Sequence, residues 1–213
     1  MLNNIVKQNL EIKFYKFDKI FTQNSSQKEI FNITSKNIID NVLNGINGTI
    51  FAYGQIGSGK TYTIMGELDD NQNEGIIPRS FDYVFNKINY IQNENPAIKY
   101  NVNIAFLQIY LENVQDLFEP ENKVVIREGT ENEQCIDNCI WIKVKNSEEC
   151  LYAFKMGVKN RYTALEKANA HCSRSHAILI VQISKKENDD ENNAIEGNLY
   201  IVDLAGMERS DEK

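Results

Sequence analysis

The sequence has few of the features that mark secreted, membrane or nucleic-acid-binding proteins. No apolar run approaches the length that crosses a bilayer, and no apolar signal region opens the chain. Basic residues are in the minority, with 23 Lys and Arg against 30 Asp and Glu and a net charge of -7. Nucleic acids and anionic membranes are bound by basic surfaces, so we expect neither as a partner. The composition predicts a soluble protein.

Cysteine is also scarce, and the spacing of the cysteines predicts neither a disulfide framework nor a metal site. The four cysteines are Cys135, Cys139, Cys150 and Cys172, and their irregular intervals favour free thiols in a cytosolic protein. Cys135 and Cys139 have no convincing second pair of ligands, which argues against a structural zinc site. With 213 residues and 42% hydrophobic content, the chain has material for one sizeable core, so we expect a single domain.

The strongest signal is a glycine-rich stretch that follows a predicted strand. The apolar run 49–53 is typical of a buried strand, and the pattern G-x-x-x-x-G-K-[ST] comes directly after it. Glycines let successive N–H groups point into one concavity and hold phosphate oxygens. We expect Lys60 to reach the β and γ phosphates and the Thr61 hydroxyl to ligate Mg²⁺. The predicted phosphate loop consists of Gly54, Gln55, Ile56, Gly57, Ser58, Gly59, Lys60 and Thr61.

The remaining patterns predict alternating helices and strands, and hence an α/β fold. Expected strands cover 10–17, 49–53, 100–110, 124–127, 140–144, 177–183 and 198–203. Expected helices cover 26–43, a short segment from residue 62 to 65, a segment from Pro78 to Ile91, and 147–160. The polar segments 66–74 and 185–193 are predicted to be exposed loops.

Two further polar features accompany the phosphate loop. Asp203 ends the last apolar strand, where phosphate-loop nucleoside triphosphatases place an Asp that holds Mg²⁺, usually through water. The segment 169–176, Asn-Ala-His-Cys-Ser-Arg-Ser-His, is either a capped turn or a γ-phosphate sensor. As a sensor, Ser173 would add a hydroxyl to Mg²⁺ or the phosphate, and Arg174 would pair with Glu208.

Taken in order, these motifs closely resemble those of the kinesin motor domain. The resemblance spans nearly the whole chain, so we expect residues 1–213 to form one partial kinesin motor domain. The phosphate loop is 54–61, the first switch is 169–176 and the second switch is Asp203-Leu-Ala-Gly-Met-Glu208. Gly75-Ile-Ile-Pro-Arg79, Phe106-Leu-Gln-Ile-Tyr110, Asp116-Leu117 and Asn160-Arg161 also look like kinesin segments. A small GTPase would need an Asn-Lys-x-Asp motif, which this chain lacks.

The resemblance implies a mixed central sheet with helices on both faces, and ATP with Mg²⁺ as ligands. It implies an ATPase that moves along microtubules, located in the cytoplasm on the cytoskeleton. By resemblance, Thr61 and Ser173 ligate Mg²⁺, Asp203 holds it through water, and the Gly206 N–H senses the γ-phosphate. Arg174 with Glu208 closes the switches over the attacking water, and Tyr62 lies against adenine.

The chain also departs from the family pattern. Cys172 replaces a Ser of the first switch, Met207 replaces a small Ser of the second, and Ile56 replaces a Thr of the loop. The resemblance also predicts a domain that is incomplete at both ends, lacking an N-terminal strand and the C-terminal microtubule-binding helix. Cys172 and Met207 favour an alternative, a non-catalytic kinesin-like nucleotide-binding or microtubule-binding module. Retention of Lys60 and the switch residues favours the enzyme.

Overall fold

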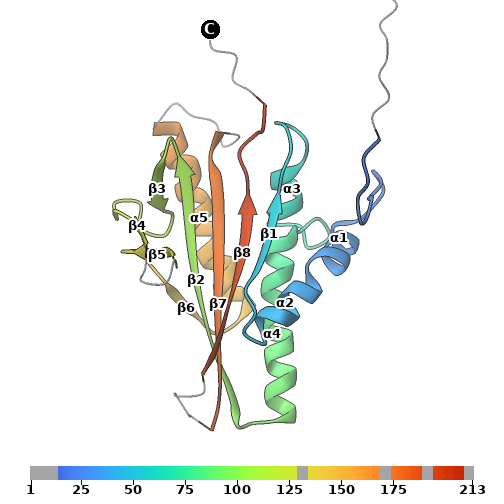
Figure 1. Cartoon of the computed structure of the whole chain (residues 1–213), viewed down its shortest axis with the longest axis vertical. Coiled ribbons are helices and arrows are strands. Elements are labelled where there is room, and N and C mark those ends of the chain that lie inside the picture. Colours follow the sequence, from blue (N-terminus) through green and yellow to red (C-terminus); the bar gives the residue numbers. More distant parts are fainter. Residues whose placement is uncertain (1–13, 129–133, 168–173, 189–193, 209–213) are drawn as a thin grey trace, which may run out of the picture.

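A mixed β-sheet forms the centre of the molecule. The computed structural model describes residues 14–128, 134–167, 174–188 and 194–208. Within these ranges the main sheet has the strand order β1-β8-β7-β2-β3, and β6 pairs with β2 beside β3 (Figure 1). β1 and β8 are parallel and the other neighbours are antiparallel. The strands are β1 (Gly48–Ala52), β2 (Ile98–Tyr110), β3 (Asn113–Asp116), β6 (Ile142–Val144), β7 (His176–Glu187) and β8 (Ile195–Asp203).

Helices cover one face of this sheet, and in Figure 1 the longest of them, α5 (Ser147–Lys167), lies behind β2 and β7, whereas the others lie to the right of β1. Alternate residues of β2, such as Ile104 and Phe106, point into the same apolar core as the inward side chains of all the described helices. In α5, Phe154 is fully buried and contacts Phe106, with ring centroids 5.0 Å apart. The helices are α1 (Gln27–Thr34), α2 (Lys36–Val42), α3 (Lys60–Ile64), α4 (Ile76–Glu94) and α5 (Ser147–Lys167).

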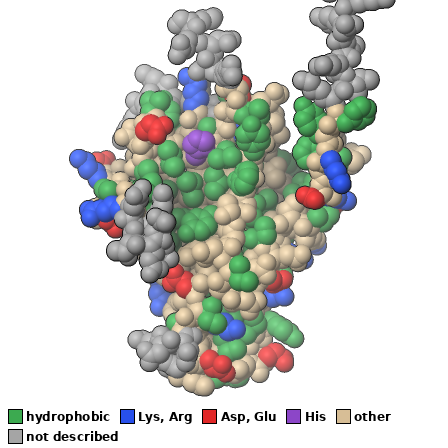
Figure 2. Space-filling model, viewed as in Figure 1, with side chains coloured by type: hydrophobic (Ala, Val, Ile, Leu, Met, Phe, Trp, Pro, Cys, Tyr) green, Lys and Arg blue, Asp and Glu red, His purple; other side chains and the backbone are tan. Residues whose placement is uncertain are grey.

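The opposite face of the sheet carries less cover. Leu107 and Ile180 form a small second cluster, packed against Ile136 from the hairpin of β4 (Val125–Glu128) and β5 (Gln134–Asp137). Figure 2, which views this face, shows hydrophobic side chains across its middle. The predicted mixed α/β sheet is confirmed. The resemblance to kinesins also implied helices on both faces. In the described residues the helices share one face.

Several boundaries differ from the predictions for local reasons. The helix expected over 26–43 divides at Ser35, where the Thr34 hydroxyl donates to the Ile30 carbonyl oxygen at 2.8 Å, a bond that bends helices. The strand expected over 10–17 is absent from its described part, 14–17. β7 continues to Glu187, within the expected loop 185–193, because its charged end pairs with the beginning of β2. The short strands β3 and β5 were not predicted.

The remaining expectations concern membranes and thiols. No helix in the described ranges is long and apolar enough to cross a membrane. Cys139 and Cys150 are free thiols, as expected. Burial raises the pKa of the Cys150 thiol to about 12, with a smaller contribution from nearby Glu149, so this thiol is neutral at physiological pH. Cys172 lies outside the described residues.

A glycine sets how closely α5 approaches the sheet. A Cβ at Gly157 would lie 2.5 Å from Cδ1 of Phe106, a ring that is 1% exposed. The ring is held between Phe118 and Phe154 and has little room to move. Gly157 therefore fixes the spacing between α5 and β2 at the cost of helix propensity.

We predict that Gly157→Ala lowers the free energy of unfolding by about 1 kcal/mol. The helix gains about 1 kcal/mol in propensity, and overpacking against Phe106 costs about 1–3 kcal/mol. In a Phe106→Leu background the same change should be neutral or stabilising, because the ring is gone. Urea denaturation of the four proteins measures this coupling, and a stabilising Gly157→Ala in the parent would contradict the packing described.

Candidate functional site

The phosphate loop lies between the end of β1 and the beginning of α3. Gly57 and Gly59 have positive φ values of 77° and 91°, which other residues adopt only with strain. A Cβ at either position would meet no atom within 4 Å, so the space above both glycines is open. A cavity of about 290 Å³ opens here, lined by the loop together with Tyr62, Asp203 and Leu204. The loop therefore has the open, glycine-lined form that phosphate binding requires.

Lys60 supplies the positive charge of this cavity. Its Nζ donates to the carbonyl oxygens of Gly54 and Gln55, both at 2.9 Å. These bonds fold the side chain back over its own loop and hold the ammonium beside the cavity. An ammonium with three donors can keep such contacts and still offer a donor to an anion.

Asp203 is brought to the loop by strand pairing. β1 and β8 run parallel, and Asp203 lies opposite Ala52, just before the loop begins. The Thr61 hydroxyl donates to Oδ2 of Asp203 at 2.8 Å. Asp203 is 3% exposed, and its Oδ1 is buried with no hydrogen-bond partner among the described residues. A buried carboxylate oxygen without a donor is costly unless a ligand satisfies it.

A buried arginine holds Asp203 from the other side. Nη1 of Arg161 lies 3.2 Å from Oδ2 of Asp203, and Nη2 donates to the carbonyl oxygen and the hydroxyl of Ser175 at 3.2 and 3.1 Å. Arg161 is 2% exposed. From the sequence, Arg161 was predicted only as part of a kinesin-like pair with Asn160, without a role in the site. α5 continues past the predicted end at residue 160 and carries Arg161 into the site.

Described parts of both switches are joined to each other and to the phosphate loop by hydrogen bonds that involve backbone and side-chain groups. Nδ1 of His176 accepts a hydrogen bond from the Ala205 N–H at 3.1 Å, which links the two switches. The Met207 N–H donates to the Gly54 carbonyl oxygen at 3.3 Å. Oε2 of Glu208 accepts a bond from the Ile56 N–H at 2.9 Å. The second switch therefore lies against the phosphate loop.

Some predicted site residues are not brought together here. Arg174 is exposed, and no ion pair joins it to Glu208 in the part of the chain that the structure describes. Ser173 lies outside the described residues.

Tyr62, the residue predicted to lie against adenine, is held by two hydrogen bonds. Its hydroxyl donates to Oδ1 of Asn73 at 3.1 Å, and its carbonyl oxygen accepts from the buried Gln27 side chain at 2.6 Å.

The donor set suits a magnesium–nucleotide complex. Thr61 and Asp203 offer the oxygen ligands that Mg²⁺ prefers, and such sites use one or two protein oxygens together with phosphates. Oδ1 of Asp203, which has no partner among the described residues, is an acceptor for a metal-bound water or a cation. The open space over Gly57 and Gly59 and the ammonium of Lys60 fit the phosphates. The residues present therefore fit both groups.

Comparison with known proteins agrees with this geometry. The family model of the kinesin motor domain matches residues 2–213. The chain is 38% identical over 198 residues to a kinesin heavy chain from Syncephalastrum racemosum and 37% identical to human kinesin-1 heavy chain. Each alignment covers 92% of this chain but only 21% and 20% of the relative. A solved fast-kinesin structure matches with a TM-score of 0.86 at 35% identity, covering 92% of this chain and 55% of the other.

We predict that Arg161→Met lowers the free energy of unfolding by about 3–5 kcal/mol, because it leaves the Asp203 carboxylate buried without its cation. The control is Arg127→Met, which removes an exposed ion pair of similar length, 2.9 Å to Asp137. That change should cost about 0–1 kcal/mol. Chemical denaturation measures both losses. Equal, small losses would show that the buried pair contributes no more than the surface pair.

Proposed function

Because the chain belongs to the kinesin motor-domain family, we propose that it binds Mg²⁺-ATP at the phosphate loop and hydrolyses it as part of a microtubule motor. The observation that carries the proposal is the position of Asp203. One of its oxygens is held by Thr61 and Arg161, and the other is buried beside the open loop with no hydrogen-bond partner in the part of the chain that the structure describes. This is the arrangement expected of a carboxylate that completes a magnesium–nucleotide site.

The loop and Lys60 bind the phosphates in this proposal. Backbone N–H groups of the loop would donate to phosphate oxygens, and the Lys60 ammonium, now on the loop carbonyls, would bind the β and γ phosphates. Thr61, Asp203 and, by family resemblance, Ser173 hold the metal, with Asp203 acting through water. When bound, Mg²⁺ neutralises charge that develops on the phosphates. Tyr62, anchored by Asn73 and Gln27, is positioned to lie against the adenine.

The switches supply the γ-phosphate response. We assign the Gly206 N–H as a γ-phosphate donor, and Arg174 with Glu208 as the pair that closes over the attacking water. In this structure Glu208 instead accepts a hydrogen bond from the Ile56 N–H, a loop donor. If the Ile56 N–H donated to a bound phosphate instead, the Glu208 carboxylate would be released from the loop. Formation of the Arg174–Glu208 pair is thereby linked to nucleotide binding.

Microtubules are the proposed partner, which would place the protein on the cytoplasmic cytoskeleton. This rests on family membership, since the chain spans about a fifth of the length of the kinesin heavy chains it matches. A non-catalytic kinesin-like module is the second candidate. Met207 favours it, because a large side chain, 53% exposed, follows the switch glycine. Measuring ATP hydrolysis by the full protein distinguishes the motor from the non-catalytic module.

We predict that Lys60→Ala abolishes nucleotide binding, because the phosphate charge in the loop is then uncompensated. Binding of a fluorescent ATP analogue to the full protein measures the effect. Lys123→Ala is the control, since Lys123 is exposed on a segment that does not line the phosphate cavity. Unchanged ATP affinity or turnover in Lys60→Ala would refute the site assignment.

We predict that Arg174→Ala and Glu208→Ala each reduce ATP turnover much more than ATP affinity, because the pair acts in the closed state. The double variant should lose much less than the sum of the two single losses, since both belong to one unit. A double-mutant cycle that reads turnover and affinity separately tests this. Additive losses, or losses confined to affinity, would show that the two residues do not form the proposed gate.

A further inference from the structure

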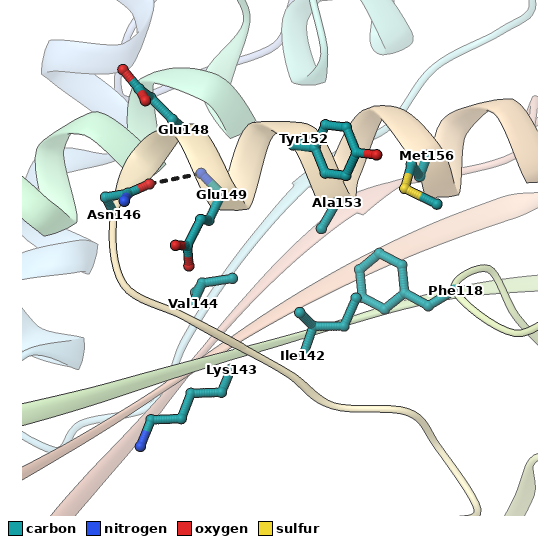
Figure 3. A pocket seen from close by; sticks show the side chains of 10 residues that line it. All are labelled: Phe118, Ile142, Lys143, Val144, Asn146, Glu148, Glu149, Tyr152, Ala153 and Met156. Carbon is teal, nitrogen blue, oxygen red and sulfur yellow. Dashed lines mark hydrogen bonds between the residues drawn. The ribbon is translucent and has the colours of Figure 1, made fainter.

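A second cavity lies between α5 and β6 and shares no residue with the phosphate cavity. Its volume is about 550 Å³, within the range of sites that bind small molecules. Figure 3 shows α5 above the cavity and the residues of β6 below it, with the Phe118 ring on the floor. We call this space the α5–β6 cavity.

The walls of the α5–β6 cavity are mainly apolar. Ile142, Val144 and Ala153 face it from the strand and the helix, beside Phe118. Tyr152 and Met156 stand at its rim and are 70% and 50% exposed. An exposed tyrosine ring and a flexible thioether next to a preformed hollow are typical of surfaces that receive an apolar or aromatic group. The body of a ligand for this cavity would therefore be apolar.

The charge at one end of the cavity is negative. Glu149 points toward Val144, below the helix, whereas Glu148 extends away on the far side (Figure 3). One oxygen of Glu149 accepts a bond from the Lys145 N–H at 2.9 Å, which fixes the carboxylate in place. No ion pair involves Glu149 in the described residues. Lys143, the basic residue in the lining, extends away from α5. The cavity thus presents a fixed negative charge beside an apolar hollow.

We propose that the α5–β6 cavity binds a small organic amine, with an apolar or aromatic body against Phe118 and Met156 and its ammonium beside Glu149. Two features of the cavity select this ligand class. An apolar body removes the exposed hydrophobic rim from water. The ammonium supplies the cation that the Glu149 carboxylate lacks.

The test compares two probes that differ in charge, 3-phenylpropylamine and 3-phenylpropan-1-ol, added to the full protein. Binding is followed by NMR of methyl-labelled methionine, reading the Met156 signal assigned from Met156→Leu. The amine should bind about two- to fivefold more tightly than the alcohol, the range expected for a partly exposed charge pair. Glu149→Gln keeps an oxygen for the Lys145 N–H and should remove that difference.

Glu166→Gln is the matched control, because it removes the same charge from an exposed position in a later turn of α5 that does not line the cavity. It should leave the preference for the amine unchanged. Met156→Lys places a cation at the rim and should weaken binding of the amine more than that of the alcohol. Equal affinity for both probes, equal effects of the two Gln variants, or no shift of the Met156 signal with either probe would overturn the proposal.

Discussion

The buried charge pair between Arg161 and Asp203 is the constraint on which the site depends. Arg161 comes from α5, Asp203 ends β8 and Ser175 precedes β7, so one guanidinium joins a helix to the ends of two strands. Removing two charges from water costs several kcal/mol per ion, and only good geometry with further hydrogen bonds offsets it. Thr61 supplies one of those bonds to Asp203. The phosphate loop is therefore tied to the core through the same carboxylate.

The helix-covered side of the sheet explains how this pair stays dry. α5 packs closely on β2 because Gly157 lets the helix backbone approach the Phe106 ring. That approach brings the last turns of α5 beside the ends of β7 and β8, where Arg161 is excluded from solvent. The other face has only the β4–β5 hairpin and a small cluster around Leu107 and Ile180 in the described residues. The stability of the site thus comes mainly from one side of the sheet.

The sequence predicted the parts of the site that are encoded locally. The glycine pattern identified the loop, and the apolar run that ends in Asp203 identified the strand-end carboxylate, because each signal lies within a few consecutive residues. Arg161 was given no role, since its partners Asp203 and Ser175 are 42 and 14 residues away and no local pattern marks a buried arginine. The contact of Glu208 with Ile56, 152 residues apart, was missed for the same reason. β3 and β5 were missed because Asn-Val-Gln-Asp and Gln-Cys-Ile-Asp begin and end with polar residues, whereas the similarly short β4 and β6 contain Val and Ile at a higher density.

The donors and acceptors of Thr61 and Asp203 show how one carboxylate can stabilise the fold and also take part in the proposed metal site. A hydroxyl has one proton and two lone pairs, and Thr61 uses its proton on Asp203. Its oxygen therefore keeps lone pairs for a cation. Oδ2 of Asp203 accepts from both Thr61 and Arg161, while Oδ1 remains for a ligand or its water. Because Arg161 already balances the charge of Asp203, this carboxylate attracts a cation weakly by itself. In the proposed function, most of the attraction for Mg²⁺ then comes from the phosphates, so metal and nucleotide are expected to bind together.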